Sequence, residues 1–157
     1  MKTRTVASAL AIAATTTTLL IGAAAGASAD GGGPTIVGMV DRATRLCLDS
    51  NSSMQAYTHV CNGGNFQLWN ETQASGYGST TDNFRDRATG YCLDSNSAGQ
   101  AYTHVCNGGG FQAWRGWYAS NGTTLWQNAA TGLCLDSNSH GSLYTHSCNW
   151  GNYQLWY

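Results

Sequence analysis

The sequence repeats one pattern of residues three times, which predicts a fold built from three similar units. The hexapeptide Cys-Leu-Asp-Ser-Asn-Ser occurs at residues 47–52, 92–97 and 134–139. At constant distances from each Asp follow a Tyr, a His, an Asn and a Trp. A catalytic centre is rarely needed three times in so short a chain, whereas linked weak sites gain from a high effective concentration. The repetition therefore favours a binding function.

The apolar residues of each copy fall in short runs separated by turn-forming residues. In the second copy the runs are residues 91–93, 101–105 and 111–114, and Gly-rich or Asn-Gly turns lie between them. This pattern predicts four short strands per copy and no helical period. Closing three such units, at about 36–75, 80–119 and 122–157, on a pseudo-threefold axis removes exposed sheet edges. We therefore expect an all-β chain with a β-trefoil fold, because a β-propeller needs at least about four blades.

The N-terminus has the features of an export signal. Lys2 and Arg4 precede a mostly apolar stretch at 6–25, and Ala27-Ser28-Ala29 supplies the small residues that a signal peptidase cleaves. We expect a signal peptide at 1–29, a flexible lead-in at 30–35, one domain at 36–157 and a secreted mature protein. A retained anchor is the alternative, but Thr and Gly residues dilute the apolar run, so membrane insertion is not expected.

Six Cys residues lie in the expected mature chain, two per copy at the same interval. Six Cys allow about 15 pairings, but a threefold arrangement pairs each first Cys with a second one, and pairing within a copy closes the shortest loop. We expect the disulfides Cys47 with Cys61, Cys92 with Cys106, and Cys134 with Cys148. Disulfides and an export signal agree on an oxidising compartment.

Charged residues are few, and their signs nearly balance. The chain has seven basic and eight acidic residues, but is rich in Gly, Asn, Ser, Thr, Tyr and Trp. Nucleic acids and anionic membrane surfaces are therefore poor candidate partners. Such a composition suits neutral ligands that carry many hydroxyl groups.

The repeated polar residues form the candidate binding sites. Tyr57 and His59 share one face of a predicted strand, and the expected disulfide joins this strand to the one with Asp49. A carboxylate accepts hydrogen bonds from two adjacent sugar hydroxyls, an Asn side chain both donates and accepts, and a Tyr ring covers the apolar face of a sugar. The candidate residues are Asp49, Tyr57, His59 and Asn62; Asp94, Tyr102, His104 and Asn107; and Asp136, Tyr144, His146 and Asn149.

Structural roles compete with this hypothesis at some positions. The Asp of each copy could instead cap the turn that follows it. The recurrent Gln-x-Trp motifs at 67–69, 112–114 and 154–156 are interpreted as core and turn-bracing elements, because Trp buries a large area. At the turn before the first Cys, Arg45 replaces Gly90 and Gly132, which predicts strain if the turn needs a positive φ.

Catalytic and metal sites are not predicted. Each copy has one His of the pattern and no thiolate to spare, which does not match common metal-ligand spacings. Each copy also has a single carboxylate at the candidate site, whereas glycosidases generally use a pair. We therefore expect no catalytic residues, no metal and no cofactor.

The triplicated Cys-Leu-Asp followed by Gln-x-Trp resembles the ricin B-type, or R-type, β-trefoil lectins. Over about residues 36–157 the fuller pattern of Leu-Asp-Ser-Asn, Tyr-Thr and Asn-Gly-Gly is most similar to the actinohivin-like three-repeat lectins of this family. The resemblance implies that the Asp, Tyr and Asn of each copy contact mannose-type glycans. The chain departs from that pattern because His59, His104 and His146 replace an apolar Leu, and because Trp150 replaces the first Gly of the third Asn-Gly-Gly.

The resulting hypothesis is a secreted lectin with up to three shallow sugar sites. One alternative is a module that binds xylan, galactan or mannan, and another is a protein-binding inhibitor on the same scaffold. The expected partner is a glycan or polysaccharide, and a monomer is favoured. If the repeated His residues contact sugar, binding should change between about pH 5 and 7.

Overall fold

The computed structural model describes residues 34–157, in which twelve short strands fall into three groups of four. The first copy contains β1 (Thr35–Val37), β2 (Cys47–Ser50), β3 (Ala56–His59) and β4 (Trp69–Gln73). The second contains β5 (Thr81–Asp86), β6 (Cys92–Ser95), β7 (Ala101–His104) and β8 (Trp114–Tyr118). The third contains β9 (Thr124–Asn128), β10 (Cys134–Ser137), β11 (Leu143–His146) and β12 (Leu155–Trp156). Short 3₁₀ turns precede the last strand of each copy: η1 (Asn65–Gln67), η2 (Gly110–Gln112) and η3 (Asn152–Gln154).

The first and last strands of each copy form an antiparallel barrel. Successive pairs join β1 to β4, β4 to β5, β5 to β8, β8 to β9 and β9 to β12. The barrel closes where the segment after β1 pairs with β12: Val40 and Tyr157 exchange two backbone hydrogen bonds, of 3.1 and 2.9 Å. Within residues 34–157, this closure leaves the barrel without a long unpaired edge, which is the advantage expected of three repeated units.

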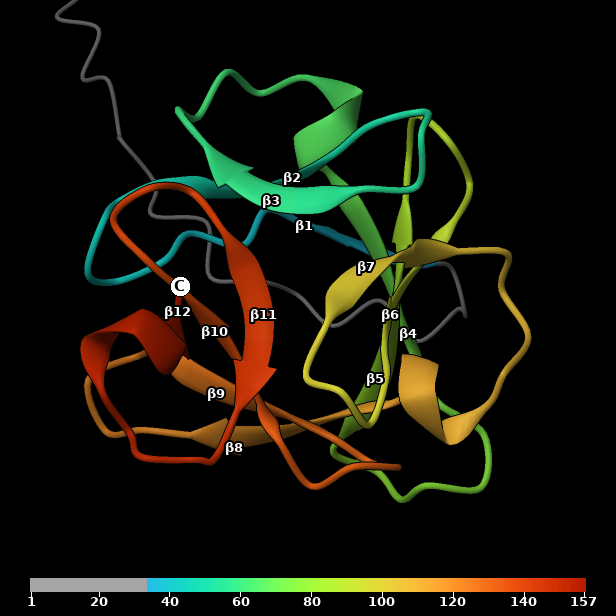
Figure 1. Cartoon of the computed structure of the whole chain (residues 1–157). Helices are drawn as coiled ribbons and strands as arrows, with labels where there is room; N and C mark the ends of the chain where they lie inside the picture. Colours follow the sequence, from blue (N-terminus) through green and yellow to red (C-terminus); the bar gives the residue numbers. More distant parts are fainter. Residues whose placement is uncertain (1–33) are drawn as a thin grey trace, which may run out of the picture. The chain divides into compact units, whose positions relative to one another are not determined.

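The two middle strands of each copy form a hairpin, and the three hairpins meet near the centre of the view in Figure 1. Strands β3, β7 and β11 are in mutual contact. Each of these strands donates one backbone hydrogen bond to the hairpin turn of another copy, as when Thr58 N donates to Gly141 O at 2.8 Å. The expected β-trefoil of three four-stranded units is confirmed.

One Leu and one Trp from each copy form the threefold-repeated part of the core. Leu48, Leu93 and Leu135 are fully buried, as are Trp69, Trp114 and Trp156. Each indole N–H donates to the carbonyl of the Leu in its own copy, at 3.4, 3.0 and 3.4 Å. The Trp residue of each Gln-x-Trp motif therefore has the structural role that the sequence predicted.

The three disulfides pair as expected, each within one copy. They join Cys47 to Cys61, Cys92 to Cys106, and Cys134 to Cys148. Each ties the start of a hairpin to the loop that follows it, so the disulfides brace the individual copies while the shared core holds the copies together.

Three positions have a left-handed backbone in all three copies, and glycine does not occupy all of them. Arg45 has φ 63°, where Gly90 and Gly132 have 74° and 70°, so the predicted strain at Arg45 is confirmed. At the hairpin turn Met54 has φ 61°, where the counterparts are Gly99 and Gly141. A non-glycine residue in this region costs roughly 1–2 kcal/mol.

The expected signal peptide at 1–29 and residues 30–33 of the lead-in lie outside the described residues. Among residues 34–157, no helix is long and apolar enough to cross a membrane.

Candidate functional site

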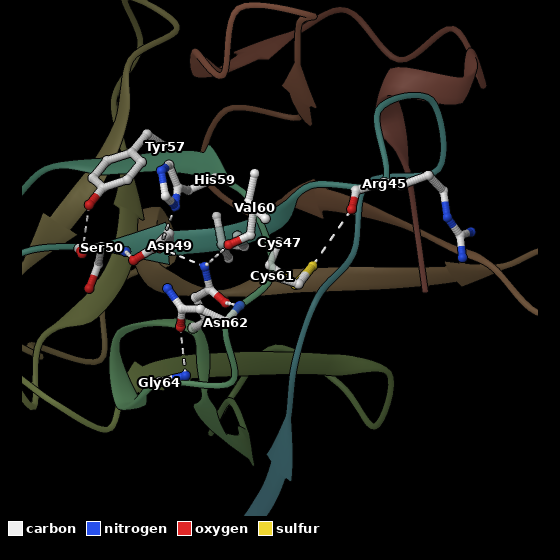
Figure 2. A network of polar contacts seen from close by, with 12 residues as sticks. Arg45, Cys47, Asp49, Ser50, Tyr57, His59, Val60, Cys61, Asn62 and Gly64 are labelled. Atoms are coloured by element: carbon white, nitrogen blue, oxygen red, sulfur yellow. Dashed lines mark hydrogen bonds and ion pairs between the residues drawn. A yellow bond between two sulfur atoms is a disulfide. The ribbon is translucent and has the colours of Figure 1, made fainter.

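The hairpin register places the candidate Asp and Tyr of each copy directly opposite each other. Asp49 in β2 pairs with Tyr57 in β3, and His59 lies two residues further along the same face. The other copies repeat this register, with Asp94 opposite Tyr102 and Asp136 opposite Tyr144. Figure 2 shows the side chains of Tyr57 and His59 close together beside Asp49, as the alternation along a strand predicts.

A buried Gln holds the carboxylate of the first copy. Asp49 is 5% exposed, and its Oδ2 accepts a hydrogen bond from Gln67 Nε2 at 2.7 Å. The same Nε2 donates to Val60 O at 3.0 Å, while Gln67 Oε1 accepts from Asn62 N at 2.7 Å. Gln67 therefore fixes the Asp strand and the Asn loop in one geometry.

The other copies contain the same brace. Gln112 donates to Asp94 and Gln154 donates to Asp136, both at 2.8 Å. Their Oε1 atoms accept from the backbone N–H of Asn107 and Asn149, again at 2.8 Å. The Gln of each Gln-x-Trp motif is thus a bracing residue, as predicted, and its partner is the candidate carboxylate.

The alternative role for the Asp, as a cap of the following turn, is filled by another residue. Asn51 Oδ1 accepts from Ser53 N at 2.9 Å and from Gln55 N at 3.2 Å. Asn96 and Asn138 make the corresponding bonds in the other copies. Asp49 Oδ1 accepts one local bond, from Ser50 N at 2.8 Å. Because the Asn closes each turn, the Asp carboxylate still keeps acceptor capacity that the turn does not use.

The Tyr hydroxyl of each site is a neutral group held in place by a backbone carbonyl. Tyr57 donates to Ser50 O at 3.2 Å, Tyr102 to Ser95 O at 3.3 Å and Tyr144 to Ser137 O at 3.0 Å. Burial raises the pKa of each Tyr, and the neighbouring Asp carboxylate raises it further. The hydroxyl group therefore keeps its proton and donates it to the backbone carbonyl, while its oxygen can accept a hydrogen bond from a ligand.

The candidate Asn and His residues are exposed. Asn62 Oδ1 accepts from Gly64 N at 2.7 Å, so the other end of the amide, Nδ2, points away from that bond and can donate (Figure 2). His59 Nδ1 lies 4.0 Å from Asp49 Oδ2, and its ring meets the Tyr57 ring edge to face at a centroid distance of 6.5 Å. The first copy thus brings all four candidate residues together around a carboxylate.

Sequence reasoning missed a recurrent exposed aromatic ring beside these residues. Phe66, Phe111 and Tyr153 are 41–43% exposed, and each lies in the 3₁₀ turn next to the buried Gln. The signal was present, because an aromatic residue precedes the Gln of every Gln-x-Trp motif.

The side chain of Trp150 lies elsewhere than its sequence position suggested. It lines a cavity together with Trp117, Leu125, Gln127 and Cys148, and none of the four candidate residues of the third copy lines that cavity. In the part of the chain that the structure describes, no group of three His, Cys, Asp or Glu side chains has the arrangement of a metal site.

A family model described as the ricin-type beta-trefoil lectin domain matches residues 35–156. No curated protein sequence matches the chain significantly.

Solved structures share the fold at low sequence identity. The designed threefold-symmetric protein ThreeFoil is 20% identical with a TM-score of 0.69, over 77% of this chain and 95% of its own. The cytolethal distending toxin of Haemophilus ducreyi is 12% identical with a TM-score of 0.67, over 78% of this chain and 81% of its own. An exo-beta-1,3-galactanase from Clostridium thermocellum is 19% identical with a TM-score of 0.69, over 78% of this chain but only 29% of its own. The fold and the family match over residues 35–156 agree, and the chain belongs to the ricin-type β-trefoil lectin family.

Proposed function

We propose that this protein is a secreted, non-catalytic lectin that binds neutral glycans through one site in each copy. The observation that carries the proposal is a buried carboxylate, held by Gln67 and directly opposite Tyr57, with equivalents in the other copies. Family membership supports carbohydrate binding in general. The three disulfides and the export signal expected at 1–29 support secretion.

The chemistry of the site matches a sugar edge. The carboxylate accepts from hydroxyl groups through charge-assisted hydrogen bonds, which are stronger than neutral ones. The Asn amide donates, the Tyr oxygen accepts, and the Tyr ring offers an apolar face to the C–H groups of a pyranose. Mannose-type glycans are the first ligands to test, since the Asp, Tyr and Asn pattern resembles that of mannose-binding relatives while the His residues depart from it.

The first prediction concerns the carboxylates. The triple variant Asp49→Asn, Asp94→Asn and Asp136→Asn keeps an oxygen for the Gln brace but loses the charge that strengthens sugar hydrogen bonds. We expect each site to weaken at least about tenfold, because charge-assisted hydrogen bonds contribute about 1.5–3 kcal/mol. A glycan array would identify the ligand, and calorimetry with that glycan would give the affinity.

A matched control is available in the same fold. Asp41 and Asp86 are buried acids outside the sites, and Asn128 occupies the corresponding position in the third copy. The variant Asp41→Asn with Asp86→Asn should therefore fold and bind as the parent protein does. Unchanged sugar binding by the triple variant, or no binding of any sugar by the parent at millimolar concentration, would contradict the proposal.

A further inference from the structure

One cavity of the barrel wall is lined by two exposed Trp residues from different copies. Trp117 in β8 and Trp150 in the loop after β11 are 45% and 50% exposed. With the buried Leu125, they and Gln127 line a cavity of about 250 Å³. Exposed aromatic side chains that line a concave surface are typical of binding sites, whereas single exposed apolar residues are common on any protein surface.

The same place between the first and second copies is polar. There the cavity is lined by Thr72, Asn83, Arg85 and Gly108 among others. In the sequence register these residues correspond to Trp117, Leu125, Gln127 and Trp150, respectively. The fold therefore does not require aromatic residues at this place.

Trp150 occupies its position at an energetic cost. Its φ is 60°, in the left-handed region where the corresponding residues Gly63 and Gly108 have 69° and 68°. A bulky residue there costs roughly 1–2 kcal/mol, and half of its side chain remains exposed, so burial offsets little of this cost. Strained residues that persist despite such a cost cluster at ligand-binding sites.

The ring of Trp117 is held in a fixed orientation. Its Nε1 donates to Gln127 Oε1 at 3.1 Å, and Gln127 Nε2 donates to Gly132 O at 2.9 Å. The side chain is thus tied through Gln127 to the turn before β10. A pre-oriented ring loses less entropy when a ligand covers it.

We propose that Trp117 and Trp150 form a fourth carbohydrate site, which stacks the apolar face of a neutral pyranose unit. The cavity lining carries no charged group, so it favours a neutral ligand, and its volume suits a ligand smaller than a typical drug molecule. Indole rings provide the apolar surface. The Gln127 Nε2 group is engaged by Gly132 O and Cys148 Sγ, but its Oε1, which accepts from Trp117, has a second lone pair for a sugar hydroxyl. This site shares no residue with the three repeated sites, so an experiment can disprove either proposal without affecting the other.

Tryptophan fluorescence distinguishes the fourth site from the repeated sites. The remaining four Trp residues are 0–6% exposed, and the repeated candidate sites contain no Trp. A ligand that covers Trp117 or Trp150 should shift the emission of the exposed indoles, whereas a ligand in the repeated sites should leave it nearly unchanged. The probes are soluble oligosaccharides of xylan, mannan, galactan and cellulose, titrated into the triple variant Asp49→Asn, Asp94→Asn and Asp136→Asn.

The corresponding cavity between the first and second copies shows which residues to substitute for the two Trp residues. Trp150→Gly and Trp117→Thr introduce the residues of the corresponding polar cavity, and Trp150→Gly also removes backbone strain. We expect each to weaken oligosaccharide binding at least tenfold, with no loss of thermal stability for Trp150→Gly. Undiminished binding by both variants would overturn the proposal, as would the absence of an emission change with every probe. Ultracentrifugation provides a further check: a dimer that Trp150→Gly converts to monomer would make this surface a contact between two copies of the chain, and would also overturn it.

Discussion

At the positions with a left-handed backbone, the space around the residue differs from one turn to another. Gly141 has φ 84°, and a Cβ on it would lie 2.7 Å from Thr58 O in the neighbouring hairpin. Gly132 has φ 70°, but a Cβ there would meet no atom within 4 Å. The two glycines share a backbone requirement and differ in the space around them, so substitutions can separate the two effects.

We predict that Gly132→Ala lowers the free energy of unfolding by about 1 kcal/mol, the cost of a left-handed Ala. Gly141→Ala should lower it by about 2–4 kcal/mol, because the methyl group also displaces a backbone contact between two copies. Urea unfolding with an unchanged m-value would measure both. Equal losses for the two variants would contradict the close packing of the hairpins.

At the scale of strands, β4 and β5 carry an acidic pair at the barrel wall. The strand register places Glu71 opposite Phe84 and Gln73 opposite Asp82, so both acids share one face. Burial raises the pKa of Glu71, and Asp82 raises it further, while burial raises the pKa of Asp82. Raised carboxyl pKa values mean that the folded state binds protons more tightly than the unfolded chain does.

The sign of the resulting pH dependence follows from linkage. The acidic pair costs no stability below the ordinary carboxyl pKa of about 4, and costs most once the pH exceeds the raised folded values. We predict that Glu71→Gln increases the urea midpoint at pH 7, and that its advantage shrinks as the pH falls toward about 4. Because Asp82 contributes to the shift of Glu71, the gains of Glu71→Gln and Asp82→Asn should not add in a double-mutant cycle. A Glu71→Gln variant no more stable than the parent at pH 7 would refute this account.

The element scale also shows what sequence patterns can predict. The alternation of side chains along a strand was sufficient to predict which residues share a face of the hairpin, because it alone puts Tyr57 and His59 on one side of β3. The disulfide pairs followed from symmetry and loop length. The contact from Gln67 to Asp49 was not predictable from local rules, since it joins a 3₁₀ turn to a strand eighteen positions earlier. The cavity between Trp117 and Trp150 was missed for the same reason, as its residues come from different copies.

At the scale of the whole molecule, three candidate sites in three copies predict strong dependence on valency. Of the three repeated sites, the variant Asp94→Asn with Asp136→Asn leaves only the one in the first copy intact. Its affinity for a free monosaccharide at that site should match the parent, but retention on a glycan-coated surface should fall about 100-fold, since linked sites raise avidity by 10²–10⁴. Surface plasmon resonance at several glycan densities would measure this. A loss merely proportional to the number of sites removed would show that the copies act separately.

The three recurrent positions with a left-handed backbone carry different residues in the three copies, which matters for protein engineering. The second copy alone has glycine at all three of these positions in residues 34–157: Gly90, Gly99 and Gly108. The first copy departs at Arg45 and Met54, and the third at Trp150. The second copy is therefore the best template for a tandem protein assembled from identical modules. At each of these three positions it has glycine, the residue that a left-handed backbone favours.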